Sequence, residues 1–141
     1  MALSKTANVI SWVFQVVVAL ILLQTLFFKF TGAEESKYIF TTLLGESEAV
    51  GRIGSGIIEL LTAALLLFPR TAWLGAMLAL GTASGAALSH LTKLGVVVKD
   101  DGGLLFALAL VVFAGGAVIL FLRRGEIPVF GHVLGHLEGR Y

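Results

Sequence analysis

Four long apolar runs dominate this 141-residue chain and limit what it can fold into. They are Asn8–Phe30, Ile53–Phe68, Ala72–Leu91 and Leu104–Leu122. At ~1.5 Å of rise per residue, each run is about long enough to cross a hydrocarbon core roughly 30 Å thick. The second run reaches this length only when its flank Gly51–Arg52 is included. A soluble domain cannot bury four such segments at once. The runs therefore predict an all-α integral membrane protein, a four-helix bundle with spans at about 8–30, 51–69, 72–92 and 102–122.

Composition excludes several classes of function. Hydrophobic residues make up 57% of the chain and charged residues 13%, against about a quarter charged in ordinary soluble proteins. The net charge is +1 and no basic stripe is present, so no nucleic-acid partner is expected. The absence of cysteine excludes disulfides, thiolate metal sites and iron–sulfur clusters within the chain. The length suits one domain, which we expect to cover residues 1–125, with residues 126–141 as a tail at the membrane surface.

The long loop between the first two spans, residues 33–50, has an amphipathic pattern. Four glutamates surround an apolar patch that includes Tyr38, Phe40 and Leu43. Apolar residues three and four positions apart predict a short helix that lies at the membrane interface or covers the bundle. An ordinary loop helix without a ligand is the simpler interpretation, and a lid over a pocket is the alternative.

Orientation in the membrane depends on the basic residues between spans. An even number of spans places both termini on one side, and each side then holds five bases. Arg70 in the second turn and the pair Arg123–Arg124 after the last span are well placed as cytoplasmic anchors. We therefore expect both termini to be cytoplasmic.

Small residues predict where the helices touch. Gly81 and Gly85 form a GxxxG pattern in span three. Further small residues open span two and interrupt span four, namely Gly51, Gly54, Gly56, Ala107, Ala114, Gly115 and Gly116. Because lipid tails are as apolar as leucine, helices in a membrane pair through close backbone approach at such residues. Contact within one bundle is the simpler interpretation, and a homodimer interface is left open.

Polar side chains gather in the half of the predicted bundle opposite the termini. Glu59 lies ~12 Å below the start of span two at Gly51. Ionisable residues at such depth are costly, and they are usually paired or neutralised. Other polar residues fall in the same half or at its mouth, namely Gln24, Lys29, Thr82, Ser89, His90, Asp100 and Asp101. The other half is almost purely apolar.

This asymmetry predicts a polar pocket beside an apolar slot. Glu59 has two candidate partners, an ion pair with Lys29 or a shared proton with His90. A network that only ties the bundle together is the alternative. No metal site is expected, because glycines interrupt the His132/His136 pair and no third ligand is evident.

Five short motifs resemble the DoxX and DoxX-like family. The first motif, Lys29–Gly32, ends span one, and the second, Ile58–Leu61, lies within span two. The third, Pro69–Thr71, forms the second turn. The last two are Ser89–Leu91 at the end of span three and Asp100–Gly103 at the start of span four. The resemblance covers about residues 8–122. It implies a four-helix, multi-pass protein of the bacterial cytoplasmic membrane, with Lys29, Glu59, His90 and Asp101 as signature positions.

Two functions fit these observations better than others. The first is a non-catalytic module for ligand binding, assembly or anchoring, whose pocket holds a lipid-like or quinone-like molecule or a partner helix. The second is a small membrane subunit of a quinone-linked oxidoreductase, similar to thiosulfate:quinone oxidoreductase, in which Glu59 and His90 handle a proton. A transporter fits worst, because one four-span chain offers no inverted repeat. The chain is therefore not expected to be an enzyme on its own. Its expected partners are the bilayer and a membrane or redox protein.

Overall fold

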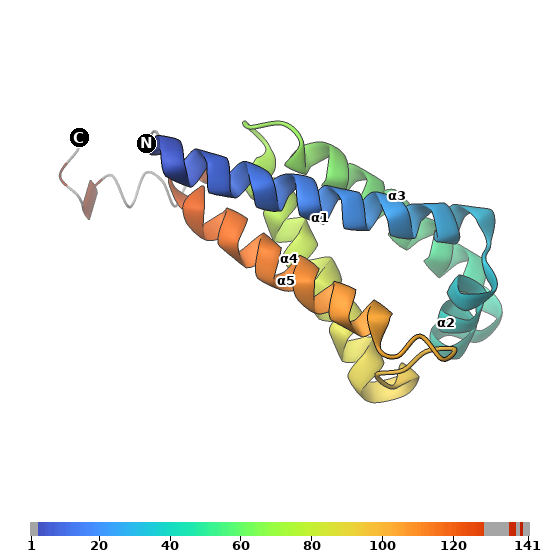
Figure 1. Ribbon diagram of the computed structural model, residues 1–141. Helices are drawn as coiled ribbons and strands as arrows, with labels where there is room; N and C mark the ends of the chain where they lie inside the picture. Colours follow the sequence, from blue (N-terminus) through green and yellow to red (C-terminus); the bar gives the residue numbers. More distant parts are fainter. Residues whose placement is uncertain (1–2, 129–135, 138, 140–141) are drawn as a thin grey trace.

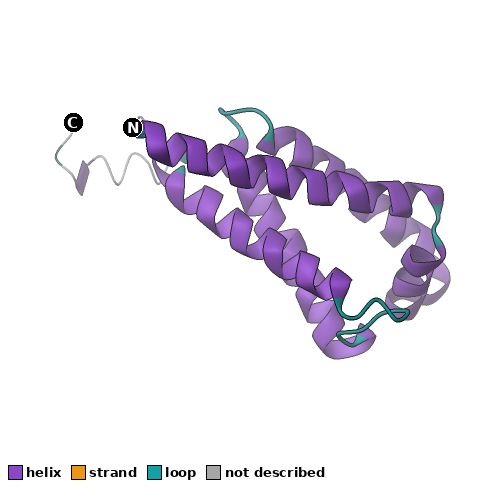
Figure 2. Ribbon diagram, in the orientation of Figure 1, coloured by secondary structure: helices purple, strands orange, loops and turns teal. Residues whose placement is uncertain are grey.

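A computed structural model describes residues 3–128, 136, 137 and 139, and throughout this part of the chain all regular elements are helices (Figures 1 and 2). The predicted all-α class is therefore confirmed. Most of the expected surface tail 126–141, including His132, lies outside the described residues.

Four of the helices are long and apolar enough to cross a membrane. These are α1 (Lys5–Thr31), α3 (Glu48–Leu66), α4 (Ala72–Ser89) and α5 (Leu104–Leu122). The predicted loop helix is present as α2 (Glu34–Leu44), and the turn η1 (Gly45–Ser47) joins it to α3. Two further short elements are the π-helical turn η2 (His90–Leu94) and the 3-10 turn η3 (Arg124–Glu126).

Local sequence explains where the helices begin and end. Ser4 caps α1 by accepting a hydrogen bond from the Ala7 N–H, and α1 ends at Gly32, whose φ of 69° suits glycine. After α3, Pro69 cannot continue a helix, and the Thr71 hydroxyl donates to the Leu65 carbonyl at 2.9 Å. The tight turn between α3 and α4 follows from these contacts.

The long helices form two pairs that converge at one end. Helices α1 and α3 pack together, as do α4 and α5, and Figure 1 shows the two pairs meeting near the start of α1 and diverging toward α2. Helix α2 lies at the open end, near the π-helical turn η2 and the loop before α5. The long helices therefore lie closest together near the termini and furthest apart near α2.

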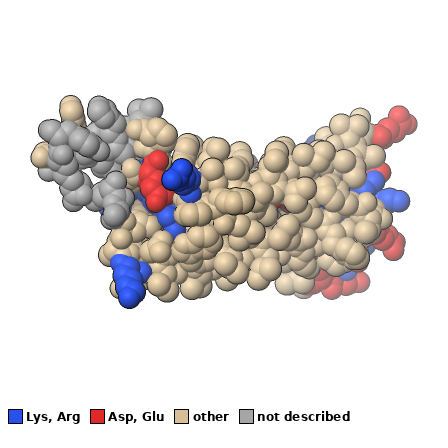
Figure 3. Space-filling model, turned by 90° about the horizontal axis from the view of Figure 1, so that it is seen from above, with Lys and Arg blue, Asp and Glu red and all other residues tan. Residues whose placement is uncertain are grey.

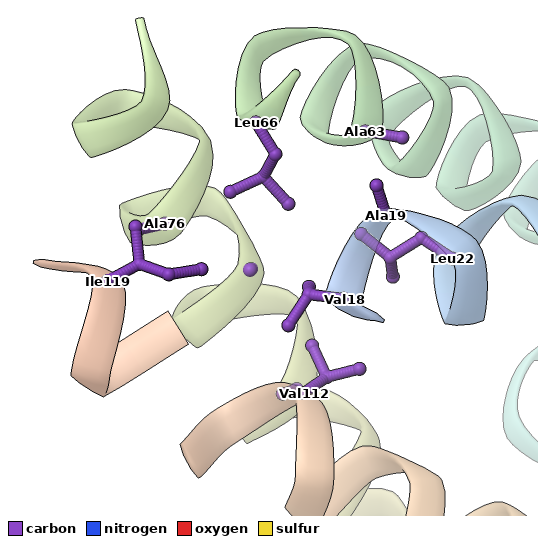
Figure 4. Close-up of a cluster of buried hydrophobic side chains, with 10 residues drawn as sticks. Val18, Ala19, Leu22, Ala63, Leu66, Ala76, Val112 and Ile119 are labelled. Carbon is purple, nitrogen blue, oxygen red and sulfur yellow. The ribbon is translucent and has the colours of Figure 1, made fainter. Parts of the chain in front are cut away.

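The apolar core fills the convergent half. All four long helices contribute to it, with Val18 and Leu22 from α1, Leu66 from α3 and Ile119 from α5 packed around the alanines of α4 (Figure 4). Each of these side chains is at most 3% exposed. The alanine face of α4 brings that helix close to its neighbours.

Gly54 and the two GxxxG glycines of span three do not lie at contacts between helices of this chain, whereas Gly116, predicted in span four, does. A Cβ atom added at Gly54, Gly81 or Gly85 would meet no atom within 4 Å, so the helices of this chain do not touch there. Close approach occurs instead at Gly75, where an added Cβ would lie 2.8 Å from the Leu66 nitrogen, and at Gly116, 3.3 Å from the Ala76 carbonyl oxygen. The GxxxG spacing marks a helix face but does not say which neighbour that face meets.

The outer surface suits a lipid environment. Large apolar side chains are exposed on every long helix, among them Leu20, Leu61, Leu88 and Phe121. On the face shown in Figure 3, lysine, arginine and acidic residues gather near the two ends and leave the middle uncharged. Exposed apolar area this extensive is unusual for a soluble monomer.

Candidate functional site

A cavity of about 630 Å³ lies where the helix pairs diverge, and α2 and the loop before α5 border it. It collects most of the predicted site residues. Among them, Gln24, Lys29, Glu59, Thr82, Ser89, His90 and Asp101 line the cavity. Asp100 is exposed and does not line it. Gly81 and Gly85 border the cavity, which explains the open space beside them.

Glu59 is the buried charge of the site, and Lys29 is its partner. Its carboxylate accepts hydrogen bonds from the Lys29 ammonium and, at 3.1 Å, from the Thr25 hydroxyl. Both side chains are largely buried, with 16% of Lys29 and 7% of Glu59 exposed. Lys29 lies in the last turn of α1, where the helix dipole favours a cation. Of the two candidate partners, the lysine forms the ion pair.

Arg52 holds the end of α1 in place. It is buried on α3, its guanidinium donates to the Lys29 carbonyl, and its Nε donates to Glu48 at 3.0 Å. This contact satisfies a carbonyl at the C-terminus of α1 and fixes the backbone that carries Lys29. The sequence places Arg52 in the flank of span two, but its role in positioning Lys29 depends on the way α1 and α3 pack.

His90 lies at the junction of α4 and the π-helical turn. The residue is 5% exposed, and its Nδ1 lies 2.9 Å from the Gly95 carbonyl oxygen. A carbonyl only accepts, so Nδ1 carries the proton in this bond. Thr82, Ala86 and His90, spaced by four along α4, all line the cavity as their shared face predicts. Ser89 is turned back to its own helix, where it donates to the Gly85 carbonyl at 2.8 Å.

Asp101 organises the loop before α5. Its carboxylate accepts from the backbone N–H groups of Val98, Gly103 and Leu105 at 2.8–3.1 Å. Burial opposes ionisation of this carboxyl, but the three N–H donors outweigh burial and hold the pKa of Asp101 below its usual range. Although the N-cap residue of α5 is Gly103, Asp101 accepts a hydrogen bond from Leu105 in the first turn of that helix.

Helix α2 closes part of the cavity, as a lid would. Phe40 and Leu43 line the cavity, whereas Tyr38 does not. The Lys99 ammonium lies over the Tyr38 ring, 4.8 Å from the ring centroid. Lys99 also lies 3.9 Å from Glu34, so the loop before α5 is tied to the first turn of α2. Gly32 and Gly45 flank α2 with positive φ angles.

A second buried polar network lies at the opposite end of the bundle, where the sequence predicted almost purely apolar packing. Arg123 is only 2% exposed. Its guanidinium donates to the Ser11 hydroxyl oxygen at 2.8 Å and to the Gln15 amide oxygen at 2.9 Å. Gln15 in turn donates to the Leu66 carbonyl. The missed signal is the i, i+4 pair of Ser11 and Gln15 on one face of α1. This network joins α1, α3 and α5 and has no contact with the cavity.

Metal binding finds no support in the described part of the chain, where no group of three or more histidine or acidic side chains is placed to hold an ion. Comparison with known proteins yields no matching family model, and no curated protein or solved structure with significant similarity. The resemblance to the DoxX family therefore rests on the five short motifs alone.

Proposed function

We propose that the protein is a membrane-embedded binding module whose cavity holds an amphipathic small molecule, lipid-like or quinone-like. One observation carries this proposal: a cavity of about 630 Å³, apolar over most of its wall, with a buried ion pair and a buried histidine on its lining. Small-molecule sites commonly have volumes of about 300–1,000 Å³ and a few polar groups in a mostly apolar wall.

The polar and apolar parts of the wall lie at different depths. Leu22, Ala109 and Val112 line the part nearest the core, and Lys29 and His90 line the part nearer α2. A molecule with its tail toward the core and its head toward α2 would match both regions. The polar groups have fixed protein partners and are therefore preorganised for binding a head group, which lowers the entropy lost on association.

The membrane assignment and orientation belong to the same proposal. The four apolar helices support a multi-pass membrane protein, and the motifs that resemble the DoxX family support the bacterial cytoplasmic membrane. A binding module of this kind acts by presenting its ligand or by assembling with a partner. It needs no chemistry of its own.

Two neighbouring alanines of α4 provide a matched test. Ala86 and Ala87 are both half-buried, but of the two only Ala86 lines the cavity. We expect wild-type protein purified without delipidation to retain a ligand in native mass spectrometry. Ala86→Phe should place a bulky ring in the cavity and weaken retention of the ligand, whereas Ala87→Phe should keep it. Equal retention by the two variants, or an empty wild-type protein, would contradict the proposal.

A further inference from the structure

Within the proposed function, we infer that the cavity selects an uncharged head group that carries a hydroxyl, such as a long-chain phenol or alcohol. The inference rests on three features of the lining: the hydrogen-bonding state of His90, the cancellation of charge at Lys29 and Glu59, and the shortage of positive charge elsewhere in the wall.

His90 presents an acceptor to the cavity. Its Nδ1 donates to the Gly95 carbonyl at 2.9 Å, so in the neutral imidazole the lone pair is on Nε2. Nε2 lies on the side of the ring away from that bond, and His90 lines the cavity. Nε2 accepts no hydrogen bond from the described residues and is not fully enclosed by them, so it is open to a donor from a ligand. A ligand hydroxyl provides that donor, whereas an ether or ketone does not.

The ion pair offers hydrogen bonds without net charge. Lys29 uses one of its three N–H donors on Glu59, and the second carboxylate oxygen accepts from Thr25. The remaining ammonium hydrogens are available to an oxygen atom of the ligand. Because Glu59 already neutralises Lys29, an anionic head group would gain little attraction from this lysine.

The other charged residues of the lining also make the binding of an anionic head group unfavourable. Its charged residues are two lysines and three carboxylates, Lys29 and Lys99 against Glu35, Glu59 and Asp101. Lys99 already lies 3.9 Å from Glu34. An anionic phospholipid head would therefore be buried without a free cation, which is strongly unfavourable in a low-dielectric site. The polarity of the wall favours a neutral hydroxylated amphiphile over an anionic lipid.

Three probes with the same tail separate these possibilities. 4-Decylphenol donates a hydrogen bond, its methyl ether 4-decylanisole only accepts one, and 4-decylbenzoate carries a negative charge. Binding is measured by native mass spectrometry of the full chain in neutral detergent, at equal probe mole fraction. We expect the phenol to bind about tenfold more tightly than either analogue, the ratio for one good hydrogen bond.

Variants of His90 provide a second measurement. His90→Phe should remove the advantage of the phenol over the ether, and His90→Gln, which retains an acceptor, should restore part of it. Equal binding of phenol and ether by the wild type, or tightest binding of the benzoate, would overturn this inference and leave the binding function standing. Failure of all three probes to bind would overturn both. The probe ratio of the wild type decides the matter even if a His90 variant does not fold.

Discussion

Asp101 gives the site a specific pH dependence of stability. Its carboxylate binds three backbone N–H groups, and its pKa in the folded protein is held below the usual value. A carboxyl with a depressed folded pKa stabilises the protein above its unfolded pKa of about 3.9, and this stabilisation is lost as pH falls toward the folded pKa. The stabilising contribution of Asp101 should therefore be complete at neutral pH and fade in acid.

The first prediction concerns this carboxylate. Asp101→Asn should lower the free energy of unfolding at pH 7 by about 1 kcal/mol, the usual cost of losing a helix cap. Asp100 is the matched control, because it is exposed and makes no hydrogen bond to this loop. Thermal unfolding in detergent between pH 3 and pH 7 measures both variants. The Asp101 variant should have the shallower acid dependence, and equal behaviour of the two variants would contradict this role.

The ion pair supplies the second prediction. Lys29→Met leaves the Glu59 carboxyl buried without its cation, which typically costs about 3–5 kcal/mol. The double variant Lys29→Met, Glu59→Leu should recover most of this loss, because an apolar pair of similar volume often replaces a buried ion pair without penalty. Unfolding in a denaturing detergent gives the comparison. A double variant as unstable as the single one would mean that the pair itself, and not the unpaired charge, determines stability.

Individual residues also mark the limits of sequence analysis. Glu59 was recognisable because a carboxyl within an apolar run must be paired or neutralised. Its choice of Lys29 over His90 depends on side-chain reach and on Arg52, which fixes the end of α1 through a contact between α1 and α3. Arg123 was read as an anchor at the membrane surface, but contacts with Ser11 and Gln15 bury it. Contacts between residues more than 100 positions apart leave little trace in a single sequence.

At the scale of elements, hydropathy located the helices well and glycine spacing located their contacts poorly. The predicted spans agree with α1, α3, α4 and α5 to within three residues at each boundary. Helices α1 and α3 begin three residues early, and α3 and α4 end three residues before positions 69 and 92. The π-helical turn after α4 was not anticipated, because its pattern of hydrogen bonds has no simple signature in the sequence. Contact between helices requires both a small residue and a neighbour at that height. Gly75 and Gly116 meet both conditions, and Gly81 does not.

The third prediction tests this difference. Gly75→Ala places a Cβ atom 2.8 Å from the Leu66 nitrogen and should destabilise the protein by about 1–3 kcal/mol through overpacking. Gly81→Ala meets open space and should be neutral or stabilising by up to about 1 kcal/mol, because alanine favours a helix over glycine. Unfolding of both variants in the same detergent provides the measurement. Destabilisation by the Gly81 variant equal to that of the Gly75 variant would indicate that Gly81 packs against something outside this chain, such as a second copy.

At the scale of the whole molecule, the structure changes the balance of basic residues between the two ends. The sequence gives five bases on each side, but at the α2 end Lys29, Arg52 and Lys99 lie beside Glu59, Glu48 and Glu34. Arg123 is likewise paired, with Glu126. Lys37 and Lys93 are exposed at the α2 end, and at the other end Lys5 and Arg70 are exposed and Arg124 is half-buried. Orientation follows the lysines and arginines near the ends of the spans, and Arg70 and Arg124 lie directly at span ends on the side of the termini. We therefore expect cytoplasmic termini, as the positions of Arg70 and Arg124 predict.

The last prediction tests that orientation with single cysteines, for which the cysteine-free chain is well suited. Ser47 is exposed beyond α2, and Gly125 follows α5 at the opposite end. In intact bacterial cells expressing the protein, a membrane-impermeant maleimide should label Ser47→Cys, and it should label Gly125→Cys only after the membrane is permeabilised. Labelling of Gly125→Cys alone in intact cells would reverse the orientation. It would also move the open end of the cavity to the cytoplasm, so that its ligand would be presented to cytoplasmic partners.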